Sequence, residues 1–475
     1  MDREGWSPFL LLICIEVTIG AVLPVGYAFG VVNSPAEFIK VWAAESANAH
    51  YSVNLSDAQV TLIWASIVSI FQIGGICGSL CAASINTRLG RRGTLQLSGL
   101  IFMVSGLLHF YCRQANSLEL LLLGRLLGGV AAAFVYSTQP IYLVELAPKE
   151  LSGSVGVFTC IGITGGVVVG QIFSFDFCWG NKSYWHWALS GFMLFVVIGL
   201  LPLCLFPESP RYLISKGNQE KTKAAIMKLR KKPEIVDKEL ARIEAAFKST
   251  AETMSIKAVI CDSKLRMPLI IVCSFHFVQQ GSGCNAIWNY SVGIFTGAGF
   301  TTSVALWLNF GLGVLNFAAA LCGPLLMTHF NRRLMMMLSC FLSAVFMILL
   351  SLGLFFSDSF KWVSYFCIFF LSMYILSFNM GLAPMPYFIG SELLLTSPLS
   401  AVMALGSLSN WLTNFIIGMI FPIMNQYIGP FAFMPFAVIC IYGFLLTYWY
   451  LPETRNRHPE EVAPLLENGF KSKIK

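Results

Sequence analysis

The sequence predicts an all-α membrane protein whose twelve transmembrane helices form two six-helix halves, joined by a cytoplasmic helical insert. Three observations predict this fold class. Of the 475 residues, 56% are hydrophobic and only 12% are charged, whereas about a quarter of the residues in a soluble domain are charged. Two long stretches, 267–331 and 393–452, contain no Asp, Glu, Lys or Arg. Short charged phrases also occur twice, about half the chain apart.

The repeated phrases indicate two copies of one unit. Gly90-Arg91-Arg92 returns as Asn331-Arg332-Arg333, Glu145 has a counterpart in Glu392, and Pro207-Glu208-Ser209-Pro210-Arg211 returns as Pro452-Glu453-Thr454-Arg455. The three markers keep their order and nearly the same offset, and each lies at the end of a hydrophobic segment. Such a pattern is typical of carriers built from an internal repeat.

The lengths of the apolar segments give the spans. A helix crosses the hydrocarbon in about 20 residues, so each uncharged stretch must contain two spans and a short turn. The expected spans are 9–31, 60–83, 93–112, 118–140, 153–175 and 185–206, followed by 267–292, 301–328, 334–356, 362–390, 399–424 and 429–451. We therefore expect a first half at 1–206, a linker at 207–266, a second half at 267–451 and a tail at 452–475.

The basic residues predict the orientation, because short cytoplasmic loops accumulate Lys and Arg. They fall on one side of the expected spans: Arg88, Arg91, Arg92, Arg332, Arg333, Arg455, Arg457, Lys471, Lys473 and Lys475. With an even number of spans, both termini are expected in the cytoplasm and the protein in the plasma membrane. Asn54-Leu55-Ser56 and Asn181-Lys182-Ser183 match the glycosylation pattern and fall on the opposite side. The net charge of +7 then lies mainly beside anionic lipid, and no nucleic-acid partner is needed to explain it.

The insert at 207–266 carries no catalytic pattern. It is rich in Lys and Glu, with helical spacing at 221–229 and 237–247. It contains no phosphate loop, metal cluster or nucleophile arrangement, so we expect no enzyme activity, no cofactor and no metal. An amphipathic helical cluster on the cytoplasmic side is the expected structure, with a regulatory binding surface as the alternative. The 14 cysteines are dispersed and read as packing residues, with pairing of Cys112 and Cys178 left open.

Polar side chains inside the spans indicate where a solute binds. Span 7 carries Gln279, Gln280, Asn285 and Asn289 around Gly281-Ser282-Gly283, a combination that predicts a broken helix. Span 10 carries Gly381, Pro384 and Pro386, preceded by Asn379 and followed by Tyr387, which predicts a second break. Broken helices at related places in a repeat protein point to a central site that opens and closes.

Spans 8 and 11 add further polar groups. Span 8 contributes Asn316, and span 11 contributes Asn410, Trp411 and Asn414. Asn410 and Asn414 are four residues apart and therefore share a helix face. Amides give and receive hydrogen bonds, which suits hydroxyl groups, and aromatic rings suit the C–H face of a sugar ring. The uncharged lining predicts a neutral cargo such as a sugar or polyol; the alternative is that the amides only join helices.

Several motifs together resemble one known family. They are Gly90-Arg91-Arg92, Gly124-Arg125, Pro207-Glu208-Ser209-Pro210-Arg211, Gln279-Gln280-Gly281-Ser282-Gly283-Cys284-Asn285, Ser409-Asn410-Trp411 and Pro452-Glu453-Thr454-Arg455. Over essentially its full length the chain resembles the facilitative hexose (glucose/fructose) transporters of the sugar-porter family, in the major facilitator superfamily. The resemblance implies the major facilitator fold and alternating access, in which two halves rock about a midplane site. It assigns sugar contact to Gln279, Gln280, Asn285, Asn316, Asn414 and Trp411, and an outer gate to Tyr290 with Asn289.

Departures from the family pattern bear on the substrate. Cys160 stands where such carriers usually have Gln, and Cys160 and Ile163 complete the expected contacts in span 5. Asn379 stands where many members have Glu, and Tyr387 where many have Trp; both are also expected substrate contacts. His276-Phe277-Val278 replaces the Gln-Leu-Ser of glucose-preferring members, whereas Ile287 resembles members that accept fructose. His276 either contacts the substrate or packs. We expect a hexose such as glucose or fructose, with urate or a polyol, or a sugar sensor that does not transport, as alternatives.

Coupling to protons is not expected. Proton-driven sugar porters similar to this chain carry an Asp in span 1, and the corresponding position, after Gly26-Tyr27, is Ala28. Glu16 is the only acidic residue of span 1 and lies 12 residues earlier, roughly 18 Å along a helix. We expect it to face the cytoplasmic half of the bundle or to pair with a basic residue, and we expect facilitated diffusion.

The repeated charges are expected to form a latch at the cytoplasmic edge. Its members are Arg91, Arg92, Glu145, Glu208, Arg332, Glu392 and Glu453. Ser152 and Leu399 replace basic residues expected from the family, and Thr328 an acidic one. Partly exposed pairs contribute about 0 to 1 kcal/mol each, so we expect a weakened latch and a resting state that leans inward-open. The expected partners are the small-molecule sugar and the bilayer, and a single chain is expected to suffice.

Overall fold

The structure is a computed structural model that describes residues 6–148, 151–230, 236–241, 243–244, 254–357, 359–360, 362–394, 396–455, 457 and 459–471. These residues form helices joined by turns, and no strand is found among them. Two compact units can be distinguished. Unit 1 comprises Met1–Val31 and Ile73–Ala251, and unit 2 comprises Val32–Gln72 and Glu252–Lys475. The segment boundaries expected from the sequence stay a prediction.

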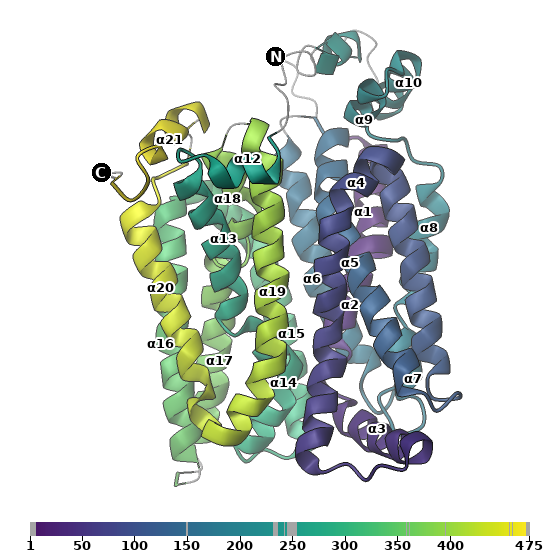
Figure 1. Ribbon diagram of the computed structural model, residues 1–475, viewed down its shortest axis with the longest axis vertical. Coiled ribbons are helices and arrows are strands. Elements are labelled where there is room, and N and C mark those ends of the chain that lie inside the picture. Colours follow the sequence, from purple (N-terminus) through teal and green to yellow (C-terminus); the bar gives the residue numbers. More distant parts are fainter. Residues whose placement is uncertain are drawn as a thin grey trace. The chain divides into compact units, whose positions relative to one another are not determined.

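Besides a helical stretch at 236–241, the described part of unit 1 contains a series of helices or parts of helices (Figure 1). In chain order they are α1 (Pro8–Val17), the π-helix η1 (Thr18–Val22), α2 (Leu23–Gly30), the second part of α4 (Asp57–Tyr111), α5 (Leu118–Leu146), α6 (Ser152–Phe173), α7 (Trp185–Ser190), α8 (Met193–Leu203), α9 (Pro210–Ser215) and α10 (Gln219–Leu229). Side-chain caps begin several of them: Ser7 accepts from the Leu10 amide, and Ser117 from the Leu120 amide.

Close contacts between glycines hold the helices of unit 1 together. A Cβ added to Gly20 of η1 would meet the backbone of Gly199 in α8, and one added to Gly26 of α2 would meet the Ile163 carbonyl in α6. Small residues that allow backbones to approach are typical of helix packing in membranes. These glycines therefore allow close backbone packing of η1 on α8 and of α2 on α6.

Unit 2 contains α3 (Ala36–Tyr51), the first part of α4 and the helices of the C-terminal half. The helices of the C-terminal half are α12 (Ile256–Cys261), α13 (Arg266–Gly281), α14 (Cys284–Gly297), α15 (Thr302–His329), α16 (Arg332–Ser357), α17 (Val363–Met380), α18 (Met385–Leu393), α19 (Thr396–Ile428), η3 (Gly429–Phe433), α20 (Met434–Tyr450), α21 (Pro459–Leu466) and η4 (Gly469–Lys471). Helix α19 runs beside α13 (Figure 1). Val462 and Leu466 of α21 are fully buried against Val259 and Leu393, and each buried side chain of this size contributes about 1.5 to 3 kcal/mol.

The twelve expected spans fall on helical residues. Eight helical stretches among the described residues are long and apolar enough to cross a membrane. Two of them, Asp57–Tyr111 with 55 residues and Ala401–Tyr450 with 50, each contain two expected spans. Span 5 corresponds to the shorter apolar helix Phe158–Phe173, and span 7 to α13 with α14. The prediction of an all-α membrane protein is confirmed.

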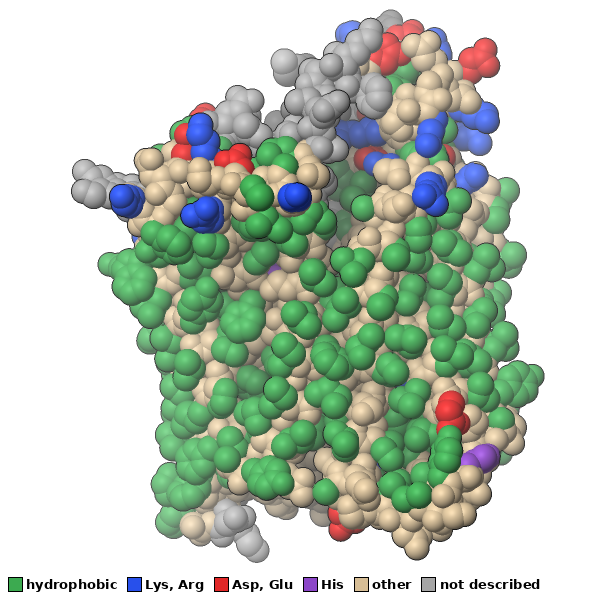
Figure 2. Space-filling view, in the orientation of Figure 1, with side chains coloured by type: hydrophobic (Ala, Val, Ile, Leu, Met, Phe, Trp, Pro, Cys, Tyr) green, Lys and Arg blue, Asp and Glu red, His purple; other side chains and the backbone are tan. Residues whose placement is uncertain are grey.

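The surface of each unit separates apolar from charged side chains (Figure 2). Apolar side chains cover the long helices, and Lys and Arg gather at the α9 and α10 end of unit 1 and at the α12 and α21 end of unit 2. Broad exposed apolar surface of this kind suits contact with lipid. The side chain of Asn54, between α3 and α4, is exposed, and that of Asn181, before α7, is partly exposed; glycosylation of both stays a prediction.

The insert forms a small apolar cluster of its own. Ile214, Ile226, Val236 and Ile243 are buried together. Arg230 contacts both carboxylate oxygens of Glu239 at 2.9 and 3.1 Å. The helical spacing expected at 221–229 is confirmed by α10, while residues 242 and 245–247 of the second expected helix lie outside the described residues. Cys112 and Cys178 are free thiols in this structure.

Candidate functional site

The break in span 7 is fixed by one glycine. Helix α13 ends at Gly281 and α14 begins at Cys284. Between them Gly283 has a φ of 88°, a left-handed conformation, and a Cβ there would collide with the ring of Phe436. The Ser282 hydroxyl lies 2.8 Å from the Gln279 carbonyl and 3.0 Å from the Tyr374 hydroxyl. The predicted break is confirmed.

The break in span 10 releases a backbone carbonyl into the bundle. Helix α17 ends at Met380 and α18 begins at Met385, with Gly381 and Pro384 in the turn. The Ser339 hydroxyl accepts the Leu382 amide at 3.0 Å. The Ala383 carbonyl accepts a hydrogen bond from Gln279 Nε2 at 2.7 Å, so the two broken spans are tied to each other.

Four side-chain amides form a continuous series of hydrogen bonds, which we call the carboxamide chain: Gln279, Gln280, Asn285 and Asn410. Asn410 Nδ2 donates to Gln279 Oε1 at 2.6 Å, and Gln280 Nε2 donates to Asn410 Oδ1 at 3.0 Å. Asn285 Nδ2 donates to Gln280 Oε1. Gln279, Asn285 and Asn410 are buried and Gln280 is partly buried. The predicted amides of spans 7 and 11 therefore meet, but they bond to one another.

The remaining predicted amides of unit 2 form two smaller contacts. Asn379 Nδ2 donates to Asn316 Oδ1 at 2.8 Å, and both side chains are buried. The Gln72 amide lies 3.3 Å from Asn414 Oδ1, within unit 2. Trp411 is buried and its ring lies 6.4 Å from that of Phe71. Gln72 and Phe71 were not predicted from the sequence.

His276 and Tyr387 lie at one end of the carboxamide chain. The His276 side chain is buried, with Nδ1 at 3.4 Å from Asn410 Nδ2 and with Nε2 lacking a hydrogen-bond partner among the described residues. Its ring packs edge-on against Tyr387, with centroids 5.7 Å apart. Tyr387 is 49% exposed, so of the predicted contacts it is the one most open to its surroundings.

The predicted gate residue Tyr290 bonds across unit 2. Its hydroxyl donates to the Gly418 carbonyl at 3.2 Å, and its ring packs against Phe421. The side chain of Asn289 lies outside the described residues. Sequence reasoning missed a buried neighbour, Asn33, whose amide donates to the Trp288 carbonyl at 3.1 Å and to Ser291 Oγ at 2.7 Å. The only sequence signal for it was a polar residue at the end of an apolar run.

The two predicted contacts of span 5 lie in unit 1. Cys160 and Ile163 are both on α6 and are partly exposed. The Cys160 carbonyl accepts from the Thr164 hydroxyl at 2.8 Å. Their contact with a substrate stays a prediction.

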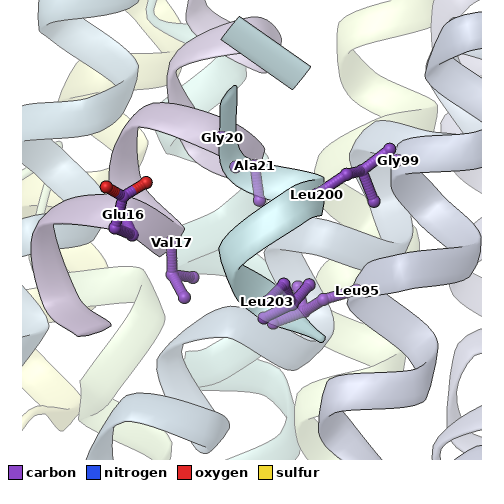
Figure 3. A pocket seen from close by; sticks show the side chains of 9 residues that line it. Glu16, Val17, Gly20, Ala21, Leu95, Gly99, Leu200 and Leu203 are labelled. Atoms are coloured by element: carbon purple, nitrogen blue, oxygen red, sulfur yellow. The ribbon is translucent and has the colours of Figure 1, made fainter. Parts of the chain in front are cut away.

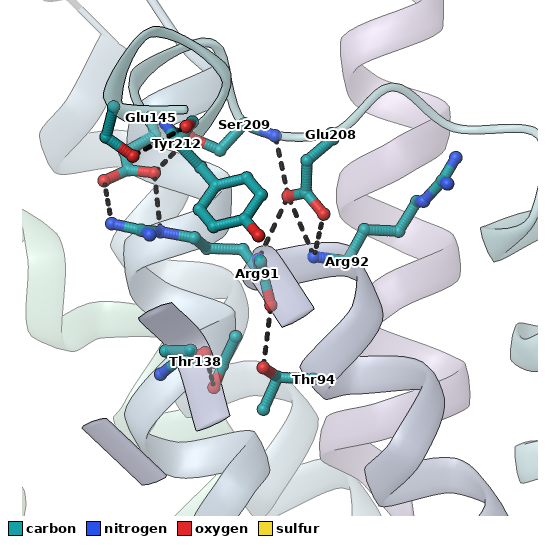
Figure 4. Close-up of polar contacts among 11 residues, drawn as sticks. Arg91, Arg92, Thr94, Thr138, Glu145, Glu208, Ser209 and Tyr212 are labelled. Atoms are coloured by element: carbon teal, nitrogen blue, oxygen red, sulfur yellow. Dashed lines mark hydrogen bonds and ion pairs between the residues drawn. The ribbon is translucent and has the colours of Figure 1, made fainter. Parts of the chain in front are cut away.

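The first charge cluster lies in unit 1 and consists of Arg91, Arg92, Glu145, Glu208 and Ser209 (Figure 4). The Arg91 guanidinium contacts both oxygens of Glu145, at 3.0 Å each. Glu208 accepts the backbone N–H groups of Arg91, Arg92 and Ser209 at 2.8 to 3.2 Å. A carboxylate with several amide donors at the start of a helix is strongly held.

The second charge cluster repeats this arrangement in unit 2 with Arg332, Arg333, Glu392, Glu453 and Thr454. Glu453 accepts the backbone N–H groups of Arg332, Arg333 and Arg455 at 2.9 to 3.2 Å. Arg332 donates from Nε and Nη2 to Oε1 of Glu392, at 3.3 and 3.4 Å. Each cluster therefore ties together helices of its own unit. The side chains of Ser152 and Thr328 lie outside the described residues.

Glu16 lies at the junction of α1 and the π-helix η1, beside a small hollow (Figure 3). The other residues that line the hollow are apolar: Val17, Gly20, Ala21, Leu95, Gly99, Gly199, Leu200 and Leu203. Oε2 of Glu16 is buried and lacks a hydrogen-bond partner among the described residues, and no basic residue among them pairs with it. Of the two expectations for Glu16, pairing with a basic residue is not found in the described part of the chain, and orientation toward the cytoplasmic half of the bundle stays a prediction.

Comparison with known proteins decides the family. The family model described as "Sugar (and other) transporter" matches residues 13–466. The chain belongs to this family. It is 31% identical over 459 residues to the solute carrier family 2 facilitated glucose transporter member 7 of Mus musculus, covering 96% of this chain and 90% of that relative. It is also 31% identical to member 3 of Ovis aries and to member 5 of Equus caballus, covering 97% of this chain and 93% of each relative.

Solved structures show the fold of this sugar-transporter-family member. The inward-open structure of the xylose transporter XylE from E. coli superposes with a TM-score of 0.78 at 20% identity, covering 96% of this chain and 99% of that one. Its partially occluded inward-open structure gives a TM-score of 0.77 at the same identity, covering 94% and 100%. The major facilitator fold expected from the sequence is confirmed.

Proposed function

We propose that the chain is a facilitative carrier that moves a hexose such as glucose or fructose across the membrane by alternating access. The observation that carries the proposal is the carboxamide chain: four uncharged amides bonded to one another beside two helix breaks, in a member of the sugar transporter family. Relatives of about the same length are facilitated glucose transporters by name.

The chemistry of the amides suits reversible sugar binding. Each amide–amide hydrogen bond exchanges for an amide–hydroxyl bond of similar strength, so the net gain per bond is only about 0.5 to 1.5 kcal/mol. A carrier needs such balance, because a solute held too tightly is not released. The broken spans supply the mobility, since the turns at Gly283 and Gly381 can adjust without dismantling whole helices.

Uniport is the coupling that the residues of span 1 favour. Ala28 cannot carry a proton, and it occupies the place of the acidic residue expected in proton-driven members. Glu16 is the remaining acidic group of that span and sits by an apolar hollow, away from the carboxamide residues in sequence and in a different unit. We propose plasma-membrane placement with both termini cytoplasmic, a single chain as the working unit, and sugar contact by the predicted residues of both units.

Urate is the second candidate because of one observation. His276 Nε2 is buried without a partner near the carboxamide chain, and an unpaired donor or acceptor there would suit a heterocycle. Sugars lack the ring nitrogens that would exploit it.

The test is uptake of radiolabelled glucose, fructose and urate into proteoliposomes, with and without an inward proton gradient. We expect saturable hexose uptake whose plateau is the same in both conditions, and the same plateau for Glu16→Gln. Accumulation of hexose that requires inward protons would overturn uniport. Uptake of urate alone would replace the hexose proposal by the second candidate.

A further inference from the structure

Two acceptors at one end, the Ala383 carbonyl and His276 Nδ1, together fix the direction of the carboxamide chain. A carbonyl oxygen only accepts, so the group of Gln279 that lies 2.7 Å from the Ala383 oxygen must be its NH2. Gln279 Oε1 then points to Asn410 and accepts a hydrogen bond from Asn410 Nδ2, at 2.6 Å. The Asn410 oxygen in turn accepts from Gln280, and the Gln280 oxygen from Asn285. All donors run in one sense.

The same reasoning determines which ring nitrogen of His276 carries a proton. Asn410 Nδ2 is a donor, so His276 Nδ1, at 3.4 Å, must be the acceptor. A neutral imidazole with an accepting Nδ1 carries its proton on Nε2. The ring edge at Nε2 lies over Gly406, where a Cβ would come within 3.1 Å of that nitrogen. An imidazolium would instead place an N–H against the Asn410 NH2, and a turn of Asn410 to avoid this would set its oxygen against Gln279 Oε1, so the bonds at Asn410 would be lost.

At the Asn285 end of the carboxamide chain, the direction of the hydrogen bonds decides which group of Asn285 a solute would meet. Asn285 donates through Nδ2, which leaves Oδ1 as its terminal oxygen, and no described residue donates to that oxygen. The Asn285 side chain is 8% exposed and Gln280 beside it is partly buried, so this end is not sealed. A group that meets Asn285 Oδ1 must be a hydrogen-bond donor, such as a sugar hydroxyl.

We infer that His276 is a positioning residue: as a neutral ring that accepts from Asn410, it holds the carboxamide chain in the sense that presents Asn285 Oδ1 as an acceptor to one hydroxyl of the transported sugar. The inference rests on the proposed function and deepens it. His276 acts through Asn410, Gln280 and Asn285 and does not itself touch the sugar. A reversed chain would offer an NH2 group in the place of that oxygen.

The experiment measures hexose uptake into proteoliposomes by the wild type, His276→Gln and His276→Leu, at equal pH on both sides. The Gln oxygen can accept from Asn410 and preserves the sense of the chain, whereas Leu offers no acceptor. We expect His276→Gln to keep KM within about threefold of wild type and His276→Leu to raise KM about tenfold.

A second readout tests specificity. Hexoses with fluorine in place of one hydroxyl at a time keep a weak acceptor and lose the donor. At one ring position the fluoro analogue should inhibit wild-type uptake at least tenfold less well than the parent sugar, and this discrimination should shrink in His276→Leu but persist in His276→Gln. If His276 only stabilised the fold, this discrimination would be the same in His276→Leu as in wild type.

Either of two results would overturn the inference while leaving the proposed function intact: discrimination among fluoro sugars that is the same in His276→Leu as in wild type, or loss of that discrimination in His276→Gln. The second result comes from a variant of similar size, so a His276→Leu protein that does not fold cannot hide the outcome. Absence of hexose uptake by the wild type would instead contradict the proposed function.

Discussion

The two units agree at their charged ends and differ in their interiors. Glu208 and Glu453 each accept three backbone N–H groups from their own unit, and each neighbouring Arg pairs with a glutamate one helix away. Inside unit 2, four amides form the carboxamide chain. Inside unit 1, α2 and η1 pack on α6 and α8 through glycine contacts. The duplicated part ties helix ends together, and the part that was not duplicated contains most of the residues that we propose to contact the solute.

The largest expected effect compares two buried amides, one in each unit. Asn410→Leu leaves Gln279 Oε1 and Gln280 Nε2 without partners, at about 1 to 3 kcal/mol each. We expect kcat/KM for hexose to fall about a hundredfold. Gln139→Leu in unit 1 removes one bond, from the Thr159 hydroxyl, and should lower it less than fivefold. Equal losses of kcat/KM in the two variants, measured at matched amounts of folded protein, would contradict a larger role in recognition for the amides of unit 2.

The next largest effect is a difference in stability between equivalent substitutions in the two charge clusters, caused by their different backbone conformations. Gly90 has a φ of 82°, and a Cβ there would lie 2.5 Å from Glu208 Oε2. Gly90→Ala should lower the free energy of unfolding by about 2 kcal/mol, because strained backbone and displacement of Glu208 add together. Asn331 occupies the equivalent place without a positive φ, so Asn331→Ala should change it by less than about 0.5 kcal/mol. Thermal unfolding in detergent measures both, and equal shifts would count against the cluster geometry.

A smaller effect compares the two ion pairs. Arg91 contacts both oxygens of Glu145, whose side chain is 7% exposed, while Arg332 contacts Oε1 of Glu392, whose side chain is 22% exposed. Glu145→Gln should therefore destabilise the protein by about 2 kcal/mol and Glu392→Gln by less than about 1 kcal/mol. A larger loss for Glu392→Gln, in the same unfolding assay, would show that the second cluster is the stronger one.

The smallest effect adds an amide to unit 1. Cys160→Gln supplies a donor and an acceptor at the α6 position where sugar carriers similar to this chain usually have Gln. If α6 contacts the sugar, KM for glucose should fall two- to fivefold, in line with one added hydrogen bond of about 0.5 to 1 kcal/mol. Cys160→Ser serves as the control of similar size. An unchanged KM would confine recognition to unit 2.

The sequence was sufficient for the helices and for their interruptions. Gly281, Gly283, Gly381 and Pro384 predicted both breaks, because glycine and proline act on the backbone locally and need no tertiary partner. The repeated phrases likewise predicted the two charge clusters, since each member sits at a helix end that the apolar segments already define.

Hydrogen-bond partners on helices far apart in the chain could not be predicted from the sequence. Spacing gave the helix face of Asn410 but not its bonds to Gln279 and Gln280, which lie about 130 residues away in the chain. Asn33 and Ser291 are 258 residues apart, and no local rule connects them. The π-helix at Thr18–Val22 and the apolar surroundings of Glu16 among the described residues were equally invisible, because neither a register slip nor the packing of distant apolar residues leaves a motif.

Entry of D-glucose and L-glucose into proteoliposomes without any ion gradient tests whether the uncharged amides of unit 2 recognise a hexose that moves down its own gradient. We expect stereoselective, saturable entry of the D form that stops when the inside concentration equals the outside concentration. Equal rates for the two enantiomers, or a final inside concentration above that outside, would contradict it.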